Sequence, residues 1–466
     1  MIQQVLNKQL LLDVLDGMQA MVENRERDGR RVSTGTPADD MGTAERAEVL
    51  DSIEIAKKFA AKEVQPRIER RGSGGELPLA ERNSYIPQSP EMSNLQSAIE
   101  QYFLEHRPEA IESSQPADRR GGSTPMTGLQ LTIWQEYLED RRLFGRFEQT
   151  DLGWISALFA QGIRRFRGKH DFVDRPVRRE PIPFADENVR MVVFGDWGSG
   201  IPRAKKVATY IRRELDDEKV RDWQKHVVHL GDVYYSGWDF EYKNRFLNDW
   251  PVKAEEKEKI GSFTLNGNHD MYSGGWGYYD CALTDGRFAH WQGQSSLFLL
   301  ANSHWQIFGL DTSHDDAGLK GDQSSWVCGA AQKGLKTMLL SHHPYCSSYE
   351  TPPQTVIDKI QPVLGNLDVA AWLWGHEHRL ITYKDVGRIR FPRCIGHGGV
   401  PVYQTHDTGS AVPAPGDWEY RDFIGDGLEH WAKFGFAVFD FHGKKISVRY
   451  VDEDGVALAD HQETIE

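Results

Sequence analysis

The chain has 466 residues, of which 39% are hydrophobic and 27% charged, and this predicts a globular protein of two or three domains. Its formal net charge of -14 argues against nucleic acid as a main partner, because phosphate backbones are bound by surplus Lys and Arg. No run approaches the roughly 20 apolar residues of a membrane-spanning helix. We therefore expect no membrane span and no nucleic-acid partner.

Two further features predict a cytoplasmic location. The N-terminus carries Asp13 and Asp16 within its most apolar segment, which is unlike a secretory signal. The four cysteines are scattered and form no Cys-x-x-Cys pair, so they predict thiols in a reducing compartment rather than a disulfide framework.

Residues 1–185 predict a mostly α-helical N-terminal domain whose role the sequence leaves unknown. Apolar residues recur at helical spacing, as at Leu11, Leu15, Met18 and Val22, and loops rich in Gly, Ser and Pro separate such stretches. These apolar faces need a partner, so we expect the helices to pack against the second domain, residues 186–466.

After residue 188 the pattern changes to short apolar strands that alternate with helical stretches, which predicts an α/β domain. A helix is expected over 203–217. Strands are expected over 190–194, 226–230, 262–265, 337–340 and 369–374, and a closing hairpin over 434–441 and 445–451.

Five polar clusters follow these strands, and their order carries most of the functional information. They are Gly195-Asp196-Trp197-Gly198, Gly231-Asp232-Val233-Tyr234-Tyr235, Gly267-Asn268-His269-Asp270, Ser341-His342-His343-Pro344 and Gly375-His376-Glu377-His378. Any one of them is explained by a turn or by a hydrogen-bonded core residue. Five in succession favour a ligand site, because strands of α/β sheets place ligands at their carboxyl ends.

The set resembles the calcineurin-like metallophosphoesterase superfamily over residues 190–455. Most members of that superfamily begin with Asp-x-His, whereas this chain has Asp196-Trp197-Gly198 and carries Tyr235 three residues after Asp232. This exchange is similar to the purple acid phosphatases, and the Gly-Asp-Trp-Gly motif most resembles their tartrate-resistant type. The resemblance implies a four-layer α/β/β/α sandwich.

The resemblance also implies two metal ions bridged by Asp232. The first would be held by Asp196, Asp232, Tyr235 and His378, and the second by Asp232, Asn268, His342 and His376. Carboxylate and phenolate oxygens favour Fe(III), while an amide oxygen with two imidazoles suits divalent Fe, Zn or Mn. Such a pair would hold a metal-bound hydroxide in line with phosphorus.

Two further histidines receive roles from the same resemblance. His269 is expected at the leaving oxygen of the substrate, with a structural role beside Asp270 as the alternative. His343 is expected to line the pocket of a small phosphorylated substrate. Phosphomonoester hydrolysis is the favoured activity. A phosphodiesterase and a scaffolding protein remain the alternatives.

Overall fold

The computed structural model describes residues 169–176, 181–402, 404, 411–424 and 431–466, together with nine isolated positions between residues 16 and 97. The chain divides into two compact units, one of Met1–Gly168 with Gly425–Glu429 and one of Lys169–Ile424 with His430–Glu466. The helices expected before residue 169 lie outside the described residues apart from those isolated positions. The second unit starts at Lys169, earlier than the boundary expected at residue 186.

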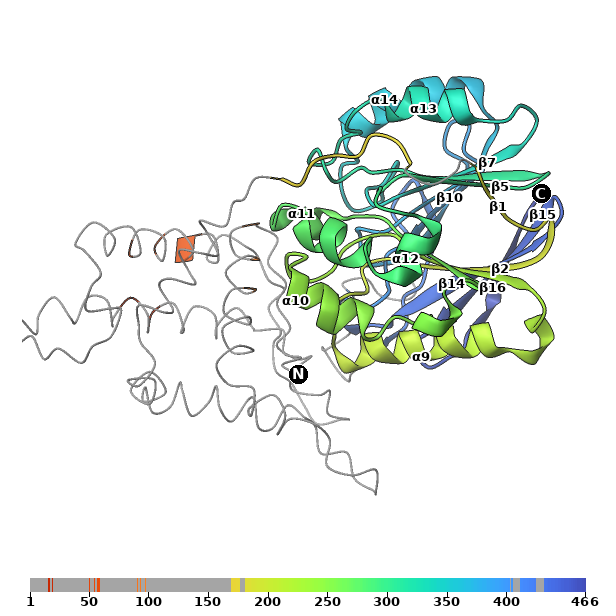
Figure 1. Cartoon of the computed structure of the whole chain (residues 1–466). Coiled ribbons are helices and arrows are strands. Elements are labelled where there is room, and N and C mark those ends of the chain that lie inside the picture. Colours follow the sequence, from red (N-terminus) through yellow and green to blue (C-terminus); the bar gives the residue numbers. More distant parts are fainter. Residues whose placement is uncertain are drawn as a thin grey trace, which may run out of the picture. The chain divides into compact units, whose positions relative to one another are not determined.

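Two β-sheets form the centre of the second unit (Figure 1). One has eight strands, in the spatial order β1 (Ile182–Pro183), β5 (Phe298–Ala301), β6 (Trp305–Gly309), β7 (Lys336–Ser341), β8 (Val369–Trp374), β10 (Phe391–Ile395), β9 (Leu380–Tyr383) and β11 (Gly416–Glu419). The other has six, in the order β16 (Ala457–Ile465), β15 (Lys445–Asp452), β14 (Gly435–His442), β2 (Glu187–Phe194), β3 (Gln224–His229) and β4 (Ile260–Thr264). A separate pair consists of β12 (Phe423–Ile424) and β13 (Trp431–Ala432).

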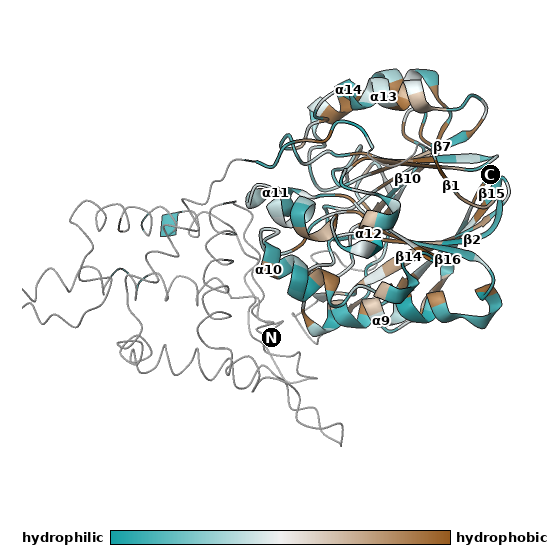
Figure 2. Ribbon diagram, viewed as in Figure 1, coloured by the Kyte–Doolittle hydropathy of each residue, from teal (hydrophilic) through white to brown (hydrophobic). Residues whose placement is uncertain are grey.

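The main hydrophobic core lies between the two sheets. In β2, the side chains of Val189, Met191 and Val193 all belong to this core, as the two-residue period of a strand requires. Leu300 of β5 and Leu340 of β7 join them from the eight-stranded sheet. Figure 2 accordingly shows hydrophobic ribbon where the sheets face each other.

Helices cover both outer faces of this sheet pair (Figure 1). On the eight-stranded sheet, α13 (Gln323–Ala330) and α14 (Gln354–Asn366) contribute Trp326 and Ile360 to a second core. On the six-stranded sheet lies α9 (Pro202–Asp216), whose Val207 and Ile211 are buried. The shorter helices are α10 (Asp239–Glu241), α11 (Asn268–Tyr272), α12 (Gly286–Trp291), η3 (Glu218–Val220), η4 (Tyr242–Leu247), η5 (Ala254–Glu256) and η6 (Tyr278–Ala282). The expected α/β fold is confirmed.

Parallel strands bring the polar clusters to one end of the sheets. Strands β2, β3 and β4 are parallel neighbours in one sheet, and β6, β7 and β8 are parallel neighbours in the other. Their carboxyl ends therefore lie at one edge of each sheet, and polar loops follow them there.

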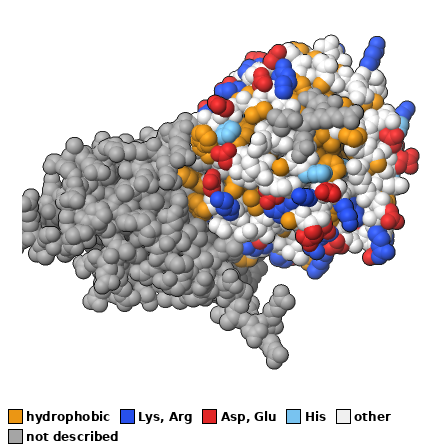
Figure 3. Space-filling view, in the orientation of Figure 1, with side chains coloured by type: hydrophobic (Ala, Val, Ile, Leu, Met, Phe, Trp, Pro, Cys, Tyr) orange, Lys and Arg blue, Asp and Glu red, His pale blue; other side chains and the backbone are white. Residues whose placement is uncertain are grey.

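The visible surface of this unit carries charged side chains of both signs (Figure 3). Among the described residues, Val456 is the large hydrophobic residue that is exposed. No helix within the described part of the chain is both long and apolar enough to cross a membrane.

Candidate metal centre

Both sheets contribute to a buried cluster of metal-binding side chains. Asp196 follows β2, Asp232 follows β3, and Asn268 begins α11 just after β4. His342 follows β7 and His376 follows β8, with His378 in the same loop. The cluster contains two groups of donor atoms that each lie within 4.8 Å of one another, one of Asp232, His342 and His376 and one of Asp196, Asp232 and His378.

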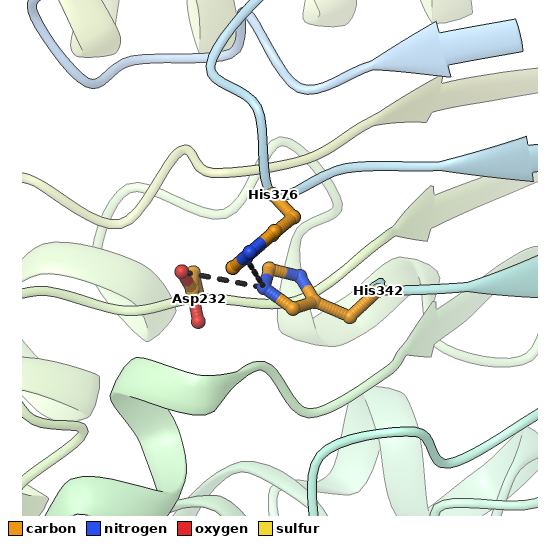
Figure 4. A group of neighbouring side chains, drawn as sticks. All are labelled: Asp232, His342 and His376. Atoms are coloured by element: carbon orange, nitrogen blue, oxygen red, sulfur yellow. Dashed lines mark hydrogen bonds and ion pairs between the residues drawn. The ribbon is translucent and has the colours of Figure 1, made fainter. Parts of the chain in front are cut away.

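Asn268 completes the group that contains His342 and His376. Its Oδ1 lies 2.9 Å from His342 Nε2 and 3.0 Å from His376 Nδ1, while its Nδ2 donates to the hydroxyl of Tyr272. His342 Nε2 is 3.4 Å from Asp232 Oδ2. Figure 4 shows Asp232, His342 and His376 converging on one point.

A cation fits this group because its atoms are all acceptors. His342 Nδ1–H donates to the carbonyl of Leu230 over 3.0 Å, which leaves a lone pair on Nε2. That nitrogen faces the amide oxygen of Asn268 and the carboxylate of Asp232, and acceptors brought together need a proton or a metal between them. Burial alone would lower the pKa of His342, but the Asp232 carboxylate outweighs burial and raises this pKa to about 9.

A tyrosine hydroxyl lies at the centre of the second group of donors. Tyr234 Oη is 3.1 Å from Asp196 Oδ1, 2.9 Å from Asp232 Oδ2 and 2.9 Å from His378 Nε2. One hydroxyl proton cannot serve three acceptors, so this group too fits a cation. Burial raises the pKa of the Asp196 carboxyl well above its ordinary value, and the neighbouring Asp232 adds to the effect.

The position of this tyrosine differs from the sequence-based expectation, which placed Tyr235 in the group. In the structure the ring of Tyr235 lies 5.0 Å from the guanidinium carbon of Arg245, and its carbonyl accepts a hydrogen bond from His269 Nδ1–H. Glu241 accepts the backbone N–H groups of Tyr235, Ser236 and Trp238 and so shapes this turn. Two adjacent tyrosines point in different directions, and the sequence motif alone does not say which one faces the cluster.

Asp232 links the two groups through one oxygen atom. Its Oδ2 faces both Tyr234 and His342, whereas Oδ1 accepts the backbone N–H of His269 over 2.9 Å. The carboxylate is completely buried. It is the one residue that both groups of donors share, as expected for a bridging ligand.

His269 and His343 lie next to the cluster. The imidazole of His269 packs between the rings of Tyr234 and Tyr272, with centroids 4.5 Å and 4.6 Å away. The ring of His343 lies 4.6 Å from that of His376, and its Nδ1 is 3.0 Å from Thr312 Oγ1. The structure thus brings together every expected site residue except the ring of Tyr235.

The backbone of the cluster is held in an unfavourable conformation. The φ angle is 56° at Asp196, 73° at Asp232, 72° at His376 and 52° at His378. A positive φ angle at a residue other than glycine destabilises the folded state by on the order of 1–3 kcal/mol. Residues in this conformation concentrate at functional sites. The presence of four candidate ligands in this conformation indicates that the cluster is a functional site.

One buried acid holds the loops that carry the candidate ligands. Asp270 accepts the backbone N–H groups of Asp232, Val233 and Gly267, so it ties the loop after β3 to the loop after β4. Burial raises the pKa of Asp270 to about 7. The sequence placed Asp270 in the polar cluster after β4 but did not reveal this role, because the role depends on which backbone groups the fold brings within reach.

Comparison with known proteins agrees with this geometry. Residues 189–380 match the family model of the calcineurin-like phosphoesterases. This match, together with the arrangement of the donor groups, makes the segment similar to calcineurin-like phosphoesterase domains. The chain is accordingly a metal-dependent phosphoester hydrolase with similarity to the purple acid phosphatases.

Mammalian acid phosphatases are among the similar curated proteins. Tartrate-resistant acid phosphatase type 5 of Homo sapiens is 25% identical over 305 residues, which cover 58% of this chain and 89% of the relative. The same enzyme of Oryctolagus cuniculus is 24% identical over 315 residues, covering 59% and 92%.

Two solved structures are also similar. One is GAP50, the anchor in the inner membrane complex of Plasmodium, with a TM-score of 0.43, 16% identity and coverage of 60% of this chain and 88% of that one. The other is a dimetal phosphatase from Danio rerio, with a TM-score of 0.38, 13% identity and coverage of 60% and 99%.

Proposed function

We propose that this phosphoesterase hydrolyses phosphomonoesters at a two-metal site, with His269 acting at the leaving oxygen. The proposal rests on one observation: the Oδ2 atom of Asp232 lies beside both groups of donor atoms. The similarity to acid phosphatases supports a monoester as the substrate. Two bound metals would supply Lewis acidity toward the phosphoryl oxygens and an activated water.

The residues divide into two ligand sets. Asp196, Asp232, Tyr234 and His378 would hold one metal, and the hard oxygen donors among them favour Fe(III). The other metal would be held by Asp232 together with Asn268, His342 and His376, a set that suits divalent Fe, Zn or Mn. Tyr234 takes the place that the motif had given to Tyr235.

His269 is oriented to move a proton through one particular atom. Its Nδ1–H donates to the carbonyl of Tyr235 over 2.6 Å, so Nε2 is the nitrogen left to exchange a proton with the leaving oxygen. Burial lowers the pKa of this imidazole, although Asp232 opposes the effect. His343, beside His376, would contact the phosphoryl group.

A comparison of two substrates tests the proposal. The purified protein is analysed for metals and then assayed with p-nitrophenyl phosphate and with bis(p-nitrophenyl) phosphate. We expect two metals per chain and a higher kcat/KM for the monoester. A higher kcat/KM for the diester would make the chain a phosphodiesterase.

A further inference from the structure

One carboxylate outside the two ligand sets lies against a ligand histidine. Glu350 Oε2 is 3.5 Å from His376 Nε2, and 37% of the Glu350 side chain is exposed. The other nitrogen of His376, Nδ1, lies 3.0 Å from Asn268 Oδ1 and 3.2 Å from His342 Nε2. His376 therefore presents Nδ1 to the other ligands and Nε2 to Glu350.

This orientation decides where the imidazole carries its hydrogen. A neutral histidine that offers a lone pair on Nδ1 holds its hydrogen on Nε2. The carboxylate of Glu350 lies 3.5 Å from this nitrogen, and a carboxylate acceptor in that place strengthens the donor power of the opposite nitrogen. His342 has only a neutral carbonyl, that of Leu230, in the equivalent place.

The loop that carries Glu350 is tied to the ligand segment itself. Ser347 Oγ accepts the backbone N–H groups of Tyr349 and Glu350, each over 2.9 Å, and donates to Glu377 Oε1. Glu377 stands between His376 and His378 in the chain. The fold thus couples the position of Glu350 to the segment that it would orient.

A second contact fixes the same loop. The hydroxyl of Tyr349 donates to Glu419 Oε2, and the guanidinium carbon of Arg379 lies 4.6 Å from the centre of the Tyr349 ring. Arg379 directly follows His378 and also donates to Glu419 over 2.8 Å. Glu350 is therefore held from both sides and does not sit on a free loop.

We propose that Glu350 is a positioning residue that orients His376 and so sets the affinity of the metal held by Asn268, His342 and His376. The inference rests on the proposed two-metal site. It assigns Glu350 no contact with the substrate, so its removal affects one metal and leaves the other unchanged.

Stepwise zinc affinity tests this role. The metal-free full-length chain is titrated with Zn²⁺ against a coloured chelator, which resolves two dissociation constants. Glu350→Ala is expected to raise one constant by roughly 10–100-fold and to leave the other unchanged. Glu350→Gln keeps an oxygen atom beside Nε2 and removes only the charge, so its effect is expected to be smaller. Asp358→Ala, which removes an exposed carboxylate of α14, is the control and is expected to change neither constant.

The outcomes separate this inference from the proposed function. A wild-type chain that binds fewer than two Zn²⁺ would overturn the two-metal site. Unchanged zinc constants in Glu350→Ala, with a normal wild type, would overturn only the role of Glu350. Unchanged constants with a lower kcat at saturating Zn²⁺ would instead place Glu350 at the substrate.

Discussion

Asp232 occupies the one position where a single atom serves both groups of donors. Replacing it with asparagine keeps the shape but removes the shared charge, and a neutral amide cannot bridge two cations in the same way. We expect Asp232→Asn to lose both metals and its turnover of p-nitrophenyl phosphate. Elemental analysis and the assay check this.

Asp440 offers a matched control for that substitution. Its carboxylate pairs over 2.8 Å with Arg190 in the middle of β2 and takes part in neither group of donors. Asp440→Asn is expected to keep both metals. Two metals and normal turnover in Asp232→Asn would contradict the bridging role.

The two adjacent tyrosines give a visible test of the ligand set. A phenolate bound to Fe(III) produces a charge-transfer band, so the iron-loaded protein should be violet to pink. Because the Tyr234 hydroxyl lies among Asp196, Asp232 and His378, we expect Tyr234→Phe to abolish the band. Tyr235→Phe is expected to keep it, and visible spectroscopy of both variants decides. A colourless Tyr235→Phe with a coloured Tyr234→Phe would show that Tyr235 is the ligand.

His269 should affect the chemical step without affecting the metals. We expect His269→Ala to lower kcat by about 10² to 10⁴ with two metals retained, because a proton donor typically contributes that much. The loss should be larger for an alkyl phosphate than for p-nitrophenyl phosphate, whose leaving group needs less protonation. His290→Ala, at an exposed position on α12, serves as the control. Equal losses for both substrates would favour a structural role.

At the scale of the elements, the turn after β4 leaves room for the bridging carboxylate. A Cβ at Gly267 would lie 1.9 Å from Asp232 Oδ1 and 2.7 Å from the Asp232 backbone nitrogen. Gly267→Ala must therefore displace Asp232, and we expect it to weaken both metals and to lower turnover at least tenfold. Metal titration and kcat measure this. Gly365→Ala in α14 is the control, because its Cβ meets no atom within 4 Å.

The strands that the sequence predicted are largely buried, although the buried strands β5, β6, β9 and β10 were not predicted. The expected segment 369–374 is β8 without change, and 226–230 is β3 moved by one or two residues, because continuous apolar runs mark buried parallel strands. Strand β16 (Ala457–Ile465) was missed, since most of its residues are exposed and its pattern is polar. An edge strand of this kind takes its structure from pairing with β15, which no local pattern reveals.

The same contrast holds within the site. Several candidate ligands follow buried strands in a recognisable order, so the sequence around them predicts them. They are Asp196, Asp232 and His342. The contact of Tyr234 with Asp232 depends on the turn after β3. The contact of Glu350 with His376 depends on a separate loop, so neither contact can be read from a local pattern. Motifs therefore predicted most of the candidate ligands, whereas the choice between the two tyrosines and the contact of Glu350 required the fold.

At the scale of the whole molecule, the site depends on the packing of two sheets. Asp196, Asp232 and Asn268 come from the six-stranded sheet, and His342 and His376 come from the eight-stranded sheet. Each metal would be held by residues of both sheets. Bound metals would thus link the two sheets at this edge, so we expect metal binding to stabilise the packing of the core between them.

The unit that carries the site includes a segment that the sequence had assigned to the N-terminal domain. His170 stacks on Tyr279 with ring centroids 4.5 Å apart, and its backbone N–H donates to the carbonyl of Gly274 over 2.8 Å. Its carbonyl accepts from His314 Nε2–H over 2.6 Å. Strand β1 then pairs with β5 before the expected boundary is reached.

Two shortened chains test where this unit begins. A chain that starts at Lys169 is expected to keep both metals and an unchanged kcat for p-nitrophenyl phosphate, because all the ligands and the packed segment remain. A chain that starts at Asp186 loses the contacts of His170 and the pairing of β1. At least eight hydrogen bonds to the rest of the unit are lost, and at about 0.5–1.5 kcal/mol each they predict a free energy of unfolding lower by at least about 4 kcal/mol, which urea denaturation of the two chains measures. Equal stability would move the boundary back to residue 186, and a lower kcat in the chain that starts at Lys169 would give residues 1–168 a part in catalysis.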